Sequence, residues 1–357
     1  MARIGIAGAG VLGRLLAWRL GHAGHAVTVF DPAPGPQAPA AGQLSGTAPH
    51  AAGFTAAGML SPLAELDSAG PAIARLGWRS LAQWRDIAHA LREQGCGAPL
   101  FAQHGSLLLA HGADLGAARR VLARLQAARD LPAPQPLDRS ALAELEPALA
   151  PGLNAWLLPD EGQVMGRELL HALATHAPGV DWRWGRRVQA VAPGALHTDD
   201  GTPHRFDLAI DVRGLGARPA LPLRGVRGEV VWLHAPGLRL LRPLRLLHPR
   251  HRVYIVPRPG DLFVVGATEI ESEDRSPVSL RSAVELMAAA QSVLPELAEA
   301  RIVHMENNLR PALPDNEPHT HTAPGLLHIN GLFRHGWLLA PALVEDALAE
   351  LGDLHLV

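Results

Sequence analysis

The first residues of the chain contain the pattern that most restricts its fold. A short apolar run over residues 3–8 leads directly into Gly8-Ala-Gly10-Val-Leu-Gly13, and an apolar helix is predicted over 11–22. In such a G-x-G-x-x-G turn the first glycine permits the tight turn, the second lets the backbone approach a pyrophosphate, and the third allows close packing of helix on strand. The helix N-terminus then faces the phosphates. The N-terminal segment therefore predicts a dinucleotide-binding unit.

A second apolar run over 26–30 ends in Asp31 and extends this interpretation. An acidic residue at the end of the second strand is where the ribose hydroxyls of a dinucleotide lie. Because a carboxylate at this position would repel a 2′-phosphate, NADP is disfavoured, and FAD and NAD both remain. A glycine-rich turn in a protein that binds no nucleotide is the simpler alternative.

Composition excludes several other classes of protein. The 357 residues carry a formal net charge of -2 and no run of like charge, so neither nucleic acid nor an anionic membrane surface is an expected partner. All 32 basic residues are arginine, which excludes a Schiff-base lysine and a Walker-type phosphate loop. The single cysteine, Cys96, cannot form an internal disulfide and fits a reducing cytoplasm. The uncharged stretch 32–64 is rich in proline and glycine, so we expect a loop there and no membrane span.

The remaining chain divides by periodicity into helical and strand segments. Helices are predicted over 71–95, 113–129, 279–293 and 336–351, and period-two strands over 228–234, 252–256 and 262–268, with further strands from 301 and over 326–331. The strands after 224 are expected to be antiparallel. This order predicts an α/β fold in which both ends of the chain form a Rossmann-like nucleotide lobe. An α+β domain built on an antiparallel sheet is inserted between them.

Two local patterns allow more than one interpretation. The run of small residues from 51 to 62, which includes Ala57, Gly58 and Met59, could hold a flat ligand against the backbone or could be a tightly packed helix start. The histidines of 248–251 and 319–321 lack a compact set of carboxylate or cysteine partners, so we interpret them as solvated loop residues. We therefore expect no metal site.

Six segments together resemble the D-amino-acid oxidase family of FAD enzymes, most closely its glycine oxidase branch, which is associated with the thiazole half of thiamine. The resemblance covers nearly the whole chain and rests on the order and spacing of 8–13, 57–60, 254–258, 264–268, 308–311 and 331–341. It implies an FAD-binding domain over 1–82, 148–222 and 306–357. A substrate-binding domain would then comprise 83–147 and 223–305.

The resemblance implies a set of residues that hold FAD without a covalent bond. The residues that would contact the adenosine and pyrophosphate are Gly8, Gly10, Val11, Leu12, Gly13, Asp31 and Val188. The residues that would contact the flavin ring are Ala57, Gly58 and Met59, together with Leu332, Phe333, Arg334, His335, Gly336, Trp337 and Leu338.

The resemblance also implies that Arg310 pairs with a substrate carboxylate and that Tyr254 assists through its hydroxyl. An arginine fork suits a carboxylate, and Tyr254 is the only tyrosine of the chain. The simpler alternatives remain that Arg310 is a surface residue next to Pro311 and that Tyr254 only packs its ring in the core. Arg334 is a second candidate for the site. Arg252 and Glu269 are weaker candidates, and both differ from the family pattern, as does the bulky Trp337.

The implied activity is oxidation of a small amino acid with O2, most closely glycine to glyoxylate, ammonia and hydrogen peroxide. The resemblance also suggests a homo-oligomer and a cytoplasmic location. A D-amino-acid or sarcosine oxidase or dehydrogenase of the same family is the nearest alternative, although the missing lysine and the position of Cys96 disfavour the sarcosine branch. An NAD-binding dehydrogenase and a non-catalytic nucleotide sensor are alternatives of other classes.

Overall fold

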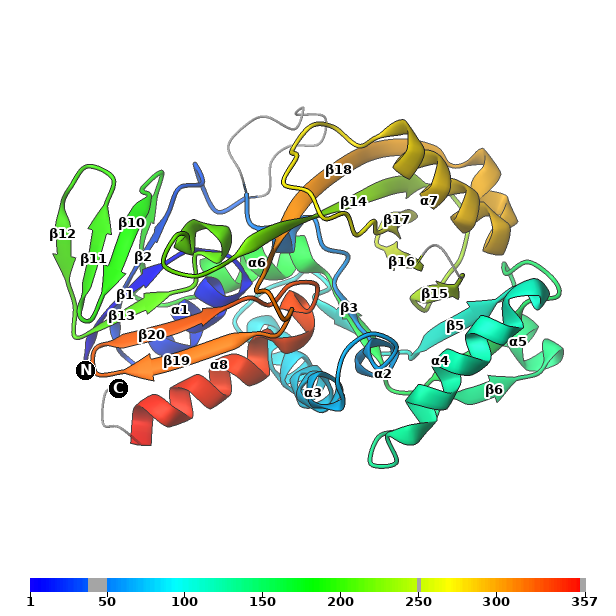
Figure 1. Cartoon of the computed structure of the whole chain (residues 1–357), viewed down its shortest axis with the longest axis horizontal. Coiled ribbons are helices and arrows are strands. Elements are labelled where there is room, and N and C mark those ends of the chain that lie inside the picture. Colours follow the sequence, from blue (N-terminus) through cyan, green and yellow to red (C-terminus); the bar gives the residue numbers. More distant parts are fainter. Residues whose placement is uncertain (38–49, 249–251, 354–357) are drawn as a thin grey trace.

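Two large β-sheets organise the chain, and they lie in opposite halves of the molecule (Figure 1). The computed structural model describes residues 1–37, 50–248 and 252–353. The N-terminus and the last described residues of the chain lie at the outer end of the half that contains the first strand (Figure 1). The fold class is thus the predicted one, a mixed α/β architecture with a second, largely antiparallel sheet.

The first sheet has six strands in the order β19-β20-β13-β1-β2-β9. All neighbours pair in parallel except the edge strand β19, which is antiparallel to β20. The central strand is a continuous apolar run because a parallel sheet is covered on both faces, and Ile4 and Ile6 are fully buried. The strands are β1 (Arg3–Ala7), β2 (Ala26–Asp31), β9 (Asp181–Trp184), β13 (Leu208–Asp211), β19 (His319–Ala323) and β20 (Leu326–Asn330).

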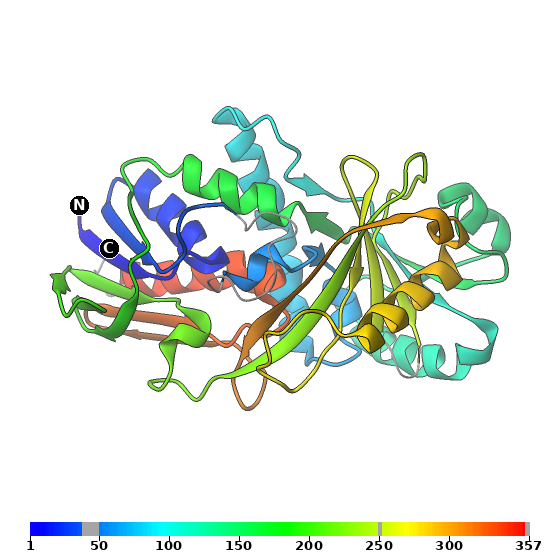
Figure 2. The same cartoon turned by 90° about the horizontal axis from the view of Figure 1, so that it is seen from above.

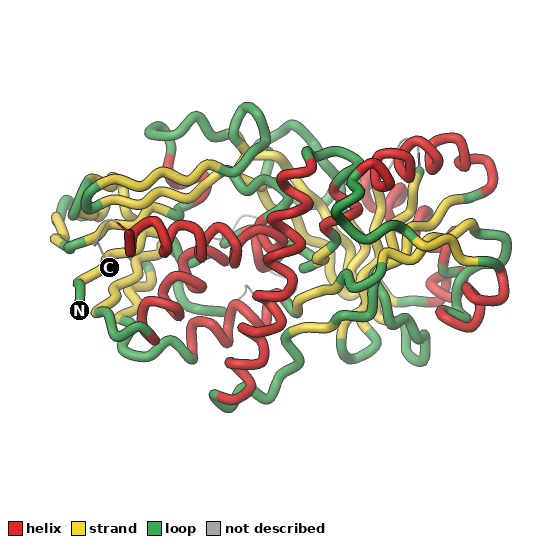
Figure 3. Tube along the Cα trace, turned by 90° about the horizontal axis from the view of Figure 1, so that it is seen from below, coloured by secondary structure: helices red, strands yellow, loops and turns green. Residues whose placement is uncertain are grey.

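Four helices pack together with this sheet in the largest apolar core. Figure 3 shows the helix that ends near the C-terminus, α8, lying across the sheet. A small sheet of three strands shares a separate apolar cluster with the six-stranded sheet. The helices are α1 (Val11–His22), α3 (Pro71–Glu93), α6 (Gly166–Thr175) and α8 (Gly336–Asp353), and the small sheet contains β10 (Val188–Ala192), β11 (Ala195–Thr198) and β12 (Pro203–Arg205).

The second large sheet has eight strands in the order β18-β14-β17-β16-β15-β5-β7-β6. Its pairs are antiparallel except β5 with β15, which is parallel. Helix α7 packs on it (Figure 2) and shares its apolar cluster. The strands are β5 (Ser106–Ala110), β6 (Gln135–Leu137), β7 (Asn154–Leu158), β14 (Arg224–His234), β15 (Leu244–Leu247), β16 (Arg252–Arg258), β17 (Leu262–Gly266) and β18 (Arg301–Ala312), and the helices of this half are α4 (Leu115–Ala127), α5 (Arg139–Leu145) and α7 (Leu280–Val293).

A short three-stranded sheet, β3-β8-β4, and the single-turn helix α2 complete the described elements together with four 3-10 turns. They are β3 (Met59–Leu60), β4 (Phe101–Ala102), β8 (Gly162–Val164), α2 (Pro62–Glu65) and the turns Ala52–Phe54, Gly112–Asp114, Gly214–Ala217 and Pro295–Glu299. Within the described part of the chain, no helix combines the length and the apolar character that crossing a membrane would require.

Most of the predicted elements are confirmed, and one local prediction is wrong. The segment from 51 to 62, which had two open interpretations, contains a 3-10 turn and β3 before α2 begins at Pro62, and Gly58 between the turn and β3 has a positive φ of 68°. His319 and His321 belong to the edge strand β19 and not to a loop. Of the other histidine stretch, residues 249–251 lie outside the described residues.

The division into two domains remains a proposal. Strand β7, at 154–158, pairs with β5 and β6 in the eight-stranded sheet, whereas the expected boundary assigns it to the nucleotide lobe. We propose to keep the two-part division and to assign this strand to the substrate-binding part.

Candidate active site

A cavity of about 1090 Å³ is lined by residues from both halves of the molecule. Its wall contains nearly all the predicted cofactor and substrate residues, although they come from distant parts of the sequence. They are Gly8, Gly10, Val11, Leu12, Asp31, Ala57, Gly58, Met59, Val188, Tyr254, Glu269, Arg310, Leu332, Phe333, Arg334, His335, Gly336, Trp337 and Leu338. Gly13 is not part of this wall, and the side chain of Arg252, at the start of β16, lies outside the described residues.

The glycines of the N-terminal turn have different steric surroundings. Gly8 has a φ of 104°, and a Cβ there would lie 2.7 Å from the Val212 carbonyl oxygen. A Cβ on Gly13 would overlap the Gly8 carbonyl oxygen, so Gly13 is required for packing. A Cβ on Gly10 would meet only the Ala51 side chain, at 3.7 Å. Helix α1 begins after Gly10 without a side-chain cap, so its first N–H groups are available to phosphate oxygens.

Asp31 stabilises the same turn from the end of β2. Its Oδ2 accepts a hydrogen bond from the Ala9 N–H at 2.6 Å, and its Oδ1 accepts one from the Ala33 N–H at 2.8 Å. Each carboxylate oxygen has a further lone pair, so the side chain can also accept hydrogen bonds from ribose hydroxyls.

Arg14, which sequence reasoning missed, supports the turn from behind. Its side chain is 1% exposed, and it donates to the Ala9 carbonyl at 2.8 Å and to the Leu170 carbonyl at 2.7 Å. The guanidinium also lies over the rings of Phe54 and Trp184. Burial lowers the pKa of Arg14 to about 10. An arginine between Gly13 and two leucines, on the side of the predicted helix expected to be buried, was the signal that could have drawn attention to it.

A second buried arginine fixes the small-residue segment before β3. Arg258 donates to the Ala57 carbonyl and, at 2.6 Å, to the Gln163 Oε1, and burial lowers its pKa to about 10. A Cβ on Gly58 would overlap the Val164 carbonyl oxygen. The backbone at Ala57–Gly58 is thus held close to β8 and borders the cavity. Arg258 stood inside a family segment, but the sequence indicated no role for it.

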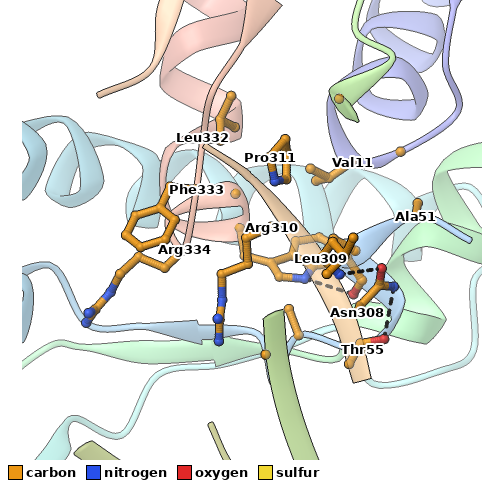
Figure 4. A pocket seen from close by; sticks show the side chains of 18 of the residues that line it. Val11, Ala51, Thr55, Asn308, Leu309, Arg310, Pro311, Leu332, Phe333 and Arg334 are labelled. Carbon is orange, nitrogen blue, oxygen red and sulfur yellow. Dashed lines mark hydrogen bonds between the residues drawn. The ribbon is translucent and has the colours of Figure 1, made fainter. Parts of the chain in front are cut away.

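Asn308 connects the same segment to β18 (Figure 4). Its Nδ2 donates to the Thr55 Oγ1 and to the His50 carbonyl, both at 3.2 Å. Thr55 donates in turn to Glu306 at 3.3 Å, and Glu306 pairs with Arg167 at 2.7 Å. This network joins the cofactor side of the cavity to the strand that carries Arg310.

The Trp337 ring lies against Gly166, where a Cβ would overlap it, and next to Gly53. The ring is 4% exposed, and its Nε1 donates to the Gly53 carbonyl at 3.1 Å. A Cβ on Gly166 would lie 2.9 Å from Trp337 Cζ2. The tryptophan that departs from the family pattern therefore ties the start of α8 to the segment around Gly53.

Arg310 presents an unpaired guanidinium at the other end of the cavity. Its Nη1 donates to the Arg227 carbonyl at 3.3 Å and its Nη2 to the Thr268 carbonyl at 3.0 Å. Among the described residues, no carboxylate lies within ion-pair distance of it. Burial lowers the pKa of Arg310, and nearby Tyr254 and Glu269 oppose that shift. Its side chain points to the same side of the cavity as that of Arg334 (Figure 4).

Glycines on neighbouring strands make space for Arg310 and Tyr254. A Cβ on Gly228 of β14 would lie 2.5 Å from Arg310 Nη2, and a Cβ on Gly266 of β17 would lie 2.8 Å from the Tyr254 hydroxyl. Burial raises the pKa of Tyr254, so its hydroxyl remains protonated at neutral pH and can donate a hydrogen bond.

Arg334 is paired, unlike Arg310. Its guanidinium lies 3.0 Å from Glu65 and 3.3 Å from Glu269, and Glu65 also contacts His335 at 2.9 Å and Arg245 at 3.3 Å. Although burial alone would raise it, the pKa of Glu65 is held well below its usual range by these three neighbours. Glu269, with a side chain 46% exposed, lies at the cavity edge. Glu65 carried no local sequence signal, since its partners are distant in the chain.

The shape and chemistry of the cavity fit a dinucleotide cofactor that carries a flat ring system. At one end of the cavity lie the uncapped start of α1 and Asp31. At the other end lies Arg310, which two backbone carbonyls hold in place, next to small residues. In the described ranges, no three His, Cys, Asp or Glu side chains come together as a group able to hold a metal ion. The cavity thus fits an oxidoreductase that uses a dinucleotide cofactor.

Comparisons with known proteins agree with that class. The family model described as FAD dependent oxidoreductase (DAO) matches residues 3–351. A thiamine biosynthesis oxidoreductase, ThiO, of Rhizobium etli is 36% identical over 354 residues, which span 98% of this chain and 96% of the relative. The chain therefore belongs to the DAO family and is an FAD-dependent oxidoreductase, which sets aside the NAD-binding alternative.

Solved structures support the same fold. The crystal structure of glycine oxidase from Geobacillus kaustophilus has a TM-score of 0.82 and 26% identity, covering 99% of this chain and 95% of that one. The iminodiacetate oxidase of Chelativorans sp. has a TM-score of 0.81 and 25% identity, covering 98% of this chain and 95% of that one. Amino-acid oxidases are thus frequent among the similar proteins.

Proposed function

We propose that this enzyme is a glycine oxidase, which converts glycine, O2 and water to glyoxylate, ammonia and hydrogen peroxide. The imine formed on the way would be the compound used in thiamine thiazole synthesis. Two kinds of observation support the proposal: the chemistry of the cavity end around Arg310, and the names of the relatives, which include ThiO and glycine oxidase.

The single observation that carries the proposal is the unpaired guanidinium of Arg310. A half-buried cation still loses part of its hydration and gains from an anion that neutralises it, and two backbone carbonyls hold the Arg310 fork in one orientation. Among the arginines that line this end of the cavity, Arg334 and Arg245 already contact Glu65. Arg310 is therefore the side chain best suited to bind a substrate carboxylate bidentately.

The residues around Arg310 would orient the substrate. The Tyr254 hydroxyl would donate a second hydrogen bond to the carboxylate, and Glu269 would lie on the side of the amine. When bound, FAD would supply the hydride acceptor, and O2 would be the final electron acceptor. The substrate amine must be neutral for its α-carbon to release a hydride, so we propose that turnover rises with pH and needs no side chain as an obligatory base. Water then hydrolyses the released imine.

For the cofactor, we propose the contacts expected from sequence. The turn at Gly8–Gly13 and Asp31 would bind the pyrophosphate and ribose, and Val188 would lie near the adenine. Ala57, Gly58 and Met59 would border the flavin ring, and residues 332–338 its pyrimidine edge. There the N-terminus of α8 would stabilise negative charge on the reduced ring.

The visible spectrum of the holoenzyme, recorded without oxygen before and after addition of glycine, tests the proposal. Bleaching of the flavin bands by glycine, followed by peroxide formation when oxygen is admitted, is the expected result. Bleaching by sarcosine, D-alanine or iminodiacetate but not by glycine would keep the family and replace the substrate. Bleaching without peroxide formation would indicate a dehydrogenase instead of an oxidase.

The Arg310→Met variant tests the proposed role of Arg310 in binding the substrate carboxylate. We expect kcat/KM for glycine to fall by about tenfold to several-thousandfold, because the substrate carboxylate loses its partner. Steady-state peroxide production measures the effect, and the flavin content of the variant serves as the control for intact cofactor binding. A decrease below threefold would remove Arg310 from the proposed role.

A further inference from the structure

One buried ion pair holds the connection between β17 and α7, which forms part of the cavity wall. Thr268, Glu269 and Arg275 of this connection line the cavity. The pair consists of Arg227 and Glu229, both on β14 and both buried, with Arg227 Nη2 at 2.6 Å from Glu229 Oε1.

Arg227 reaches the connection through Nη1 and Nη2, while its Nε and Nη2 also donate to Glu229. It donates to the carbonyl oxygens of Asp274 at 2.6 Å, Ser276 at 2.7 Å and Pro277 at 2.9 Å. Glu229 accepts from the Ser279 N–H at 3.3 Å. The pair therefore fixes the backbone of residues 274–279 against β14.

The beginning of the connection is fixed by the same two residues. The Thr268 hydroxyl accepts from the Glu229 N–H at 3.0 Å, and the Thr268 N–H donates to the Glu229 carbonyl at 3.3 Å. Arg227 and Ile270 exchange two backbone hydrogen bonds, at 2.9 and 3.0 Å.

These contacts converge on Arg310. The two carbonyl groups that orient its guanidinium belong to Arg227 and Thr268, and both of those residues are held by the ion pair or by its backbone. Gly228, between the members of the pair, supplies the space in which the guanidinium lies. The direction of the Arg310 fork thus depends on how β14 and the connection are held together.

We propose that Arg227 and Glu229 are positioning residues that aim Arg310 at the substrate carboxylate. The inference rests on the proposed role of Arg310 in binding that carboxylate. Burying an ion pair costs desolvation that its attraction often does not recover, so such a pair is weak evidence for added stability. A requirement for one defined geometry at Arg310 accounts for its presence at this position.

Titration of the bound flavin spectrum with acetate, which carries a carboxylate and no amine, measures the effect in the holoenzyme. We expect Arg227→Met to raise the dissociation constant of acetate by about tenfold to a hundredfold, the usual range for a misaligned hydrogen bond to a charged group. The matched control is Arg242→Met. Arg242 pairs with the buried Glu146 at 3.1 Å in the same half, and neither residue lines the cavity. The control should change acetate affinity by less than about threefold, whatever it does to stability.

A double-mutant cycle with Arg310→Met shows whether Arg227 affects acetate binding by orienting Arg310 or by disturbing the fold in general. If Arg227 acts through Arg310, then Arg227→Met should change acetate affinity by less than about threefold once Arg310 is replaced. An equally large change in that background would overturn the inference, as would an unchanged affinity in the Arg227→Met single variant. An unchanged acetate affinity in Arg310→Met itself would instead contradict the proposed function.

Two conservative variants keep the test decisive if Arg227→Met does not fold. Arg227→Lys retains the charge next to Glu229 but cannot span three carbonyl groups, so it should weaken acetate binding by about threefold to tenfold. Glu229→Gln retains the shape of the pair and should weaken binding less than Arg227→Lys does. Wild-type acetate affinity in both variants would contradict the proposal.

Discussion

The two ends of the cavity are built in different ways. At the cofactor end, the turn at residues 8–13 is shaped by backbone sterics, and Asp31 fixes it through two backbone N–H groups. At the substrate end, Arg310, Tyr254 and Arg334 come from β18, β16 and the segment before α8. Glycines on neighbouring strands leave space for the Arg310 and Tyr254 side chains, and networks of side-chain contacts hold them in place.

The difference shows which kind of change each end tolerates. The cofactor end has little freedom, because an added carbon at Gly13 would overlap main-chain atoms that cannot move away. At the substrate end, an added carbon at Gly228 meets the end of the flexible Arg310 side chain, so this end can adjust without unfolding. Substitution of Gly8 or Gly13 should therefore affect folding and cofactor content together, whereas substitution of Gly228 should affect substrate binding alone.

Gly13→Ala should have the largest effect. Its new Cβ would overlap the Gly8 carbonyl oxygen, so the turn must distort, and we expect the variant to purify without flavin and to unfold at a much lower temperature. Flavin content and thermal unfolding measure both effects. Gly10→Ala is the control, since its nearest contact would be 3.7 Å away. That control should fold normally and bind FAD more weakly, and normal flavin content in Gly13→Ala would remove the distinction between the two ends.

Glu161→Gln tests a buried carboxyl group that supports α2, between the two ends of the cavity. Glu161 is fully buried, accepts hydrogen bonds from the Leu63 N–H at 2.9 Å and from the Ser106 hydroxyl, and thereby holds the start of α2, which carries Glu65. Burial raises the pKa of Glu161 from 4.5 to about 7.

The raised pKa of Glu161 makes the folded protein lose stability as pH increases. Its contribution is fully present below pH 4.5 and disappears as the pH rises through about 7, a loss of about 3 kcal/mol in the free energy of unfolding. Glu161→Gln removes the titrating group, so unfolding measured between pH 5 and 8 should depend less on pH by about that amount. An identical slope in variant and wild type would show that Glu161 is ionised in both states.

Gly228→Ala should have the smallest effect and should be confined to the substrate end. A Cβ there would lie 2.5 Å from Arg310 Nη2, and the guanidinium can move away at little cost to the fold. We expect kcat/KM for glycine to fall about tenfold, or about 1.4 kcal/mol, with unchanged flavin content. Peroxide assays and flavin absorbance check the two parts, and a loss of flavin would mean that the two ends are not independent.

Sequence reasoning predicted the elements around the N-terminal glycine turn well because their signals are local. Strand, glycine turn, helix and acid follow one another within 31 residues, and β1, α1 and β2 occur within a residue of their predicted ranges. The hairpin of β16 and β17 was equally predictable, since its turn and its alternation lie in one continuous segment.

The parts that sequence reasoning missed depend on contacts between distant segments. Nothing near residue 106 indicates that β5 will pair in parallel with β15, which begins at 244. Glu65 stands in an ordinary short segment, and its importance arises from Arg245, Arg334 and His335. The roles of Arg14 and Arg258 likewise follow from backbone carbonyls that only the folded chain brings to them.

The fit of Trp337 against Gly53 and Gly166 has a consequence for engineering and for evolutionary divergence. Any side chain at Gly166, or one larger than alanine at Gly53, would compete for the volume that the indole ring fills, and a smaller residue at 337 would leave a cavity. Substitutions at Gly53, Gly166 and Trp337 are therefore expected to depend on one another. A mutant library that varies them separately should return mainly the parental residues, whereas a library that varies them jointly can reach new combinations.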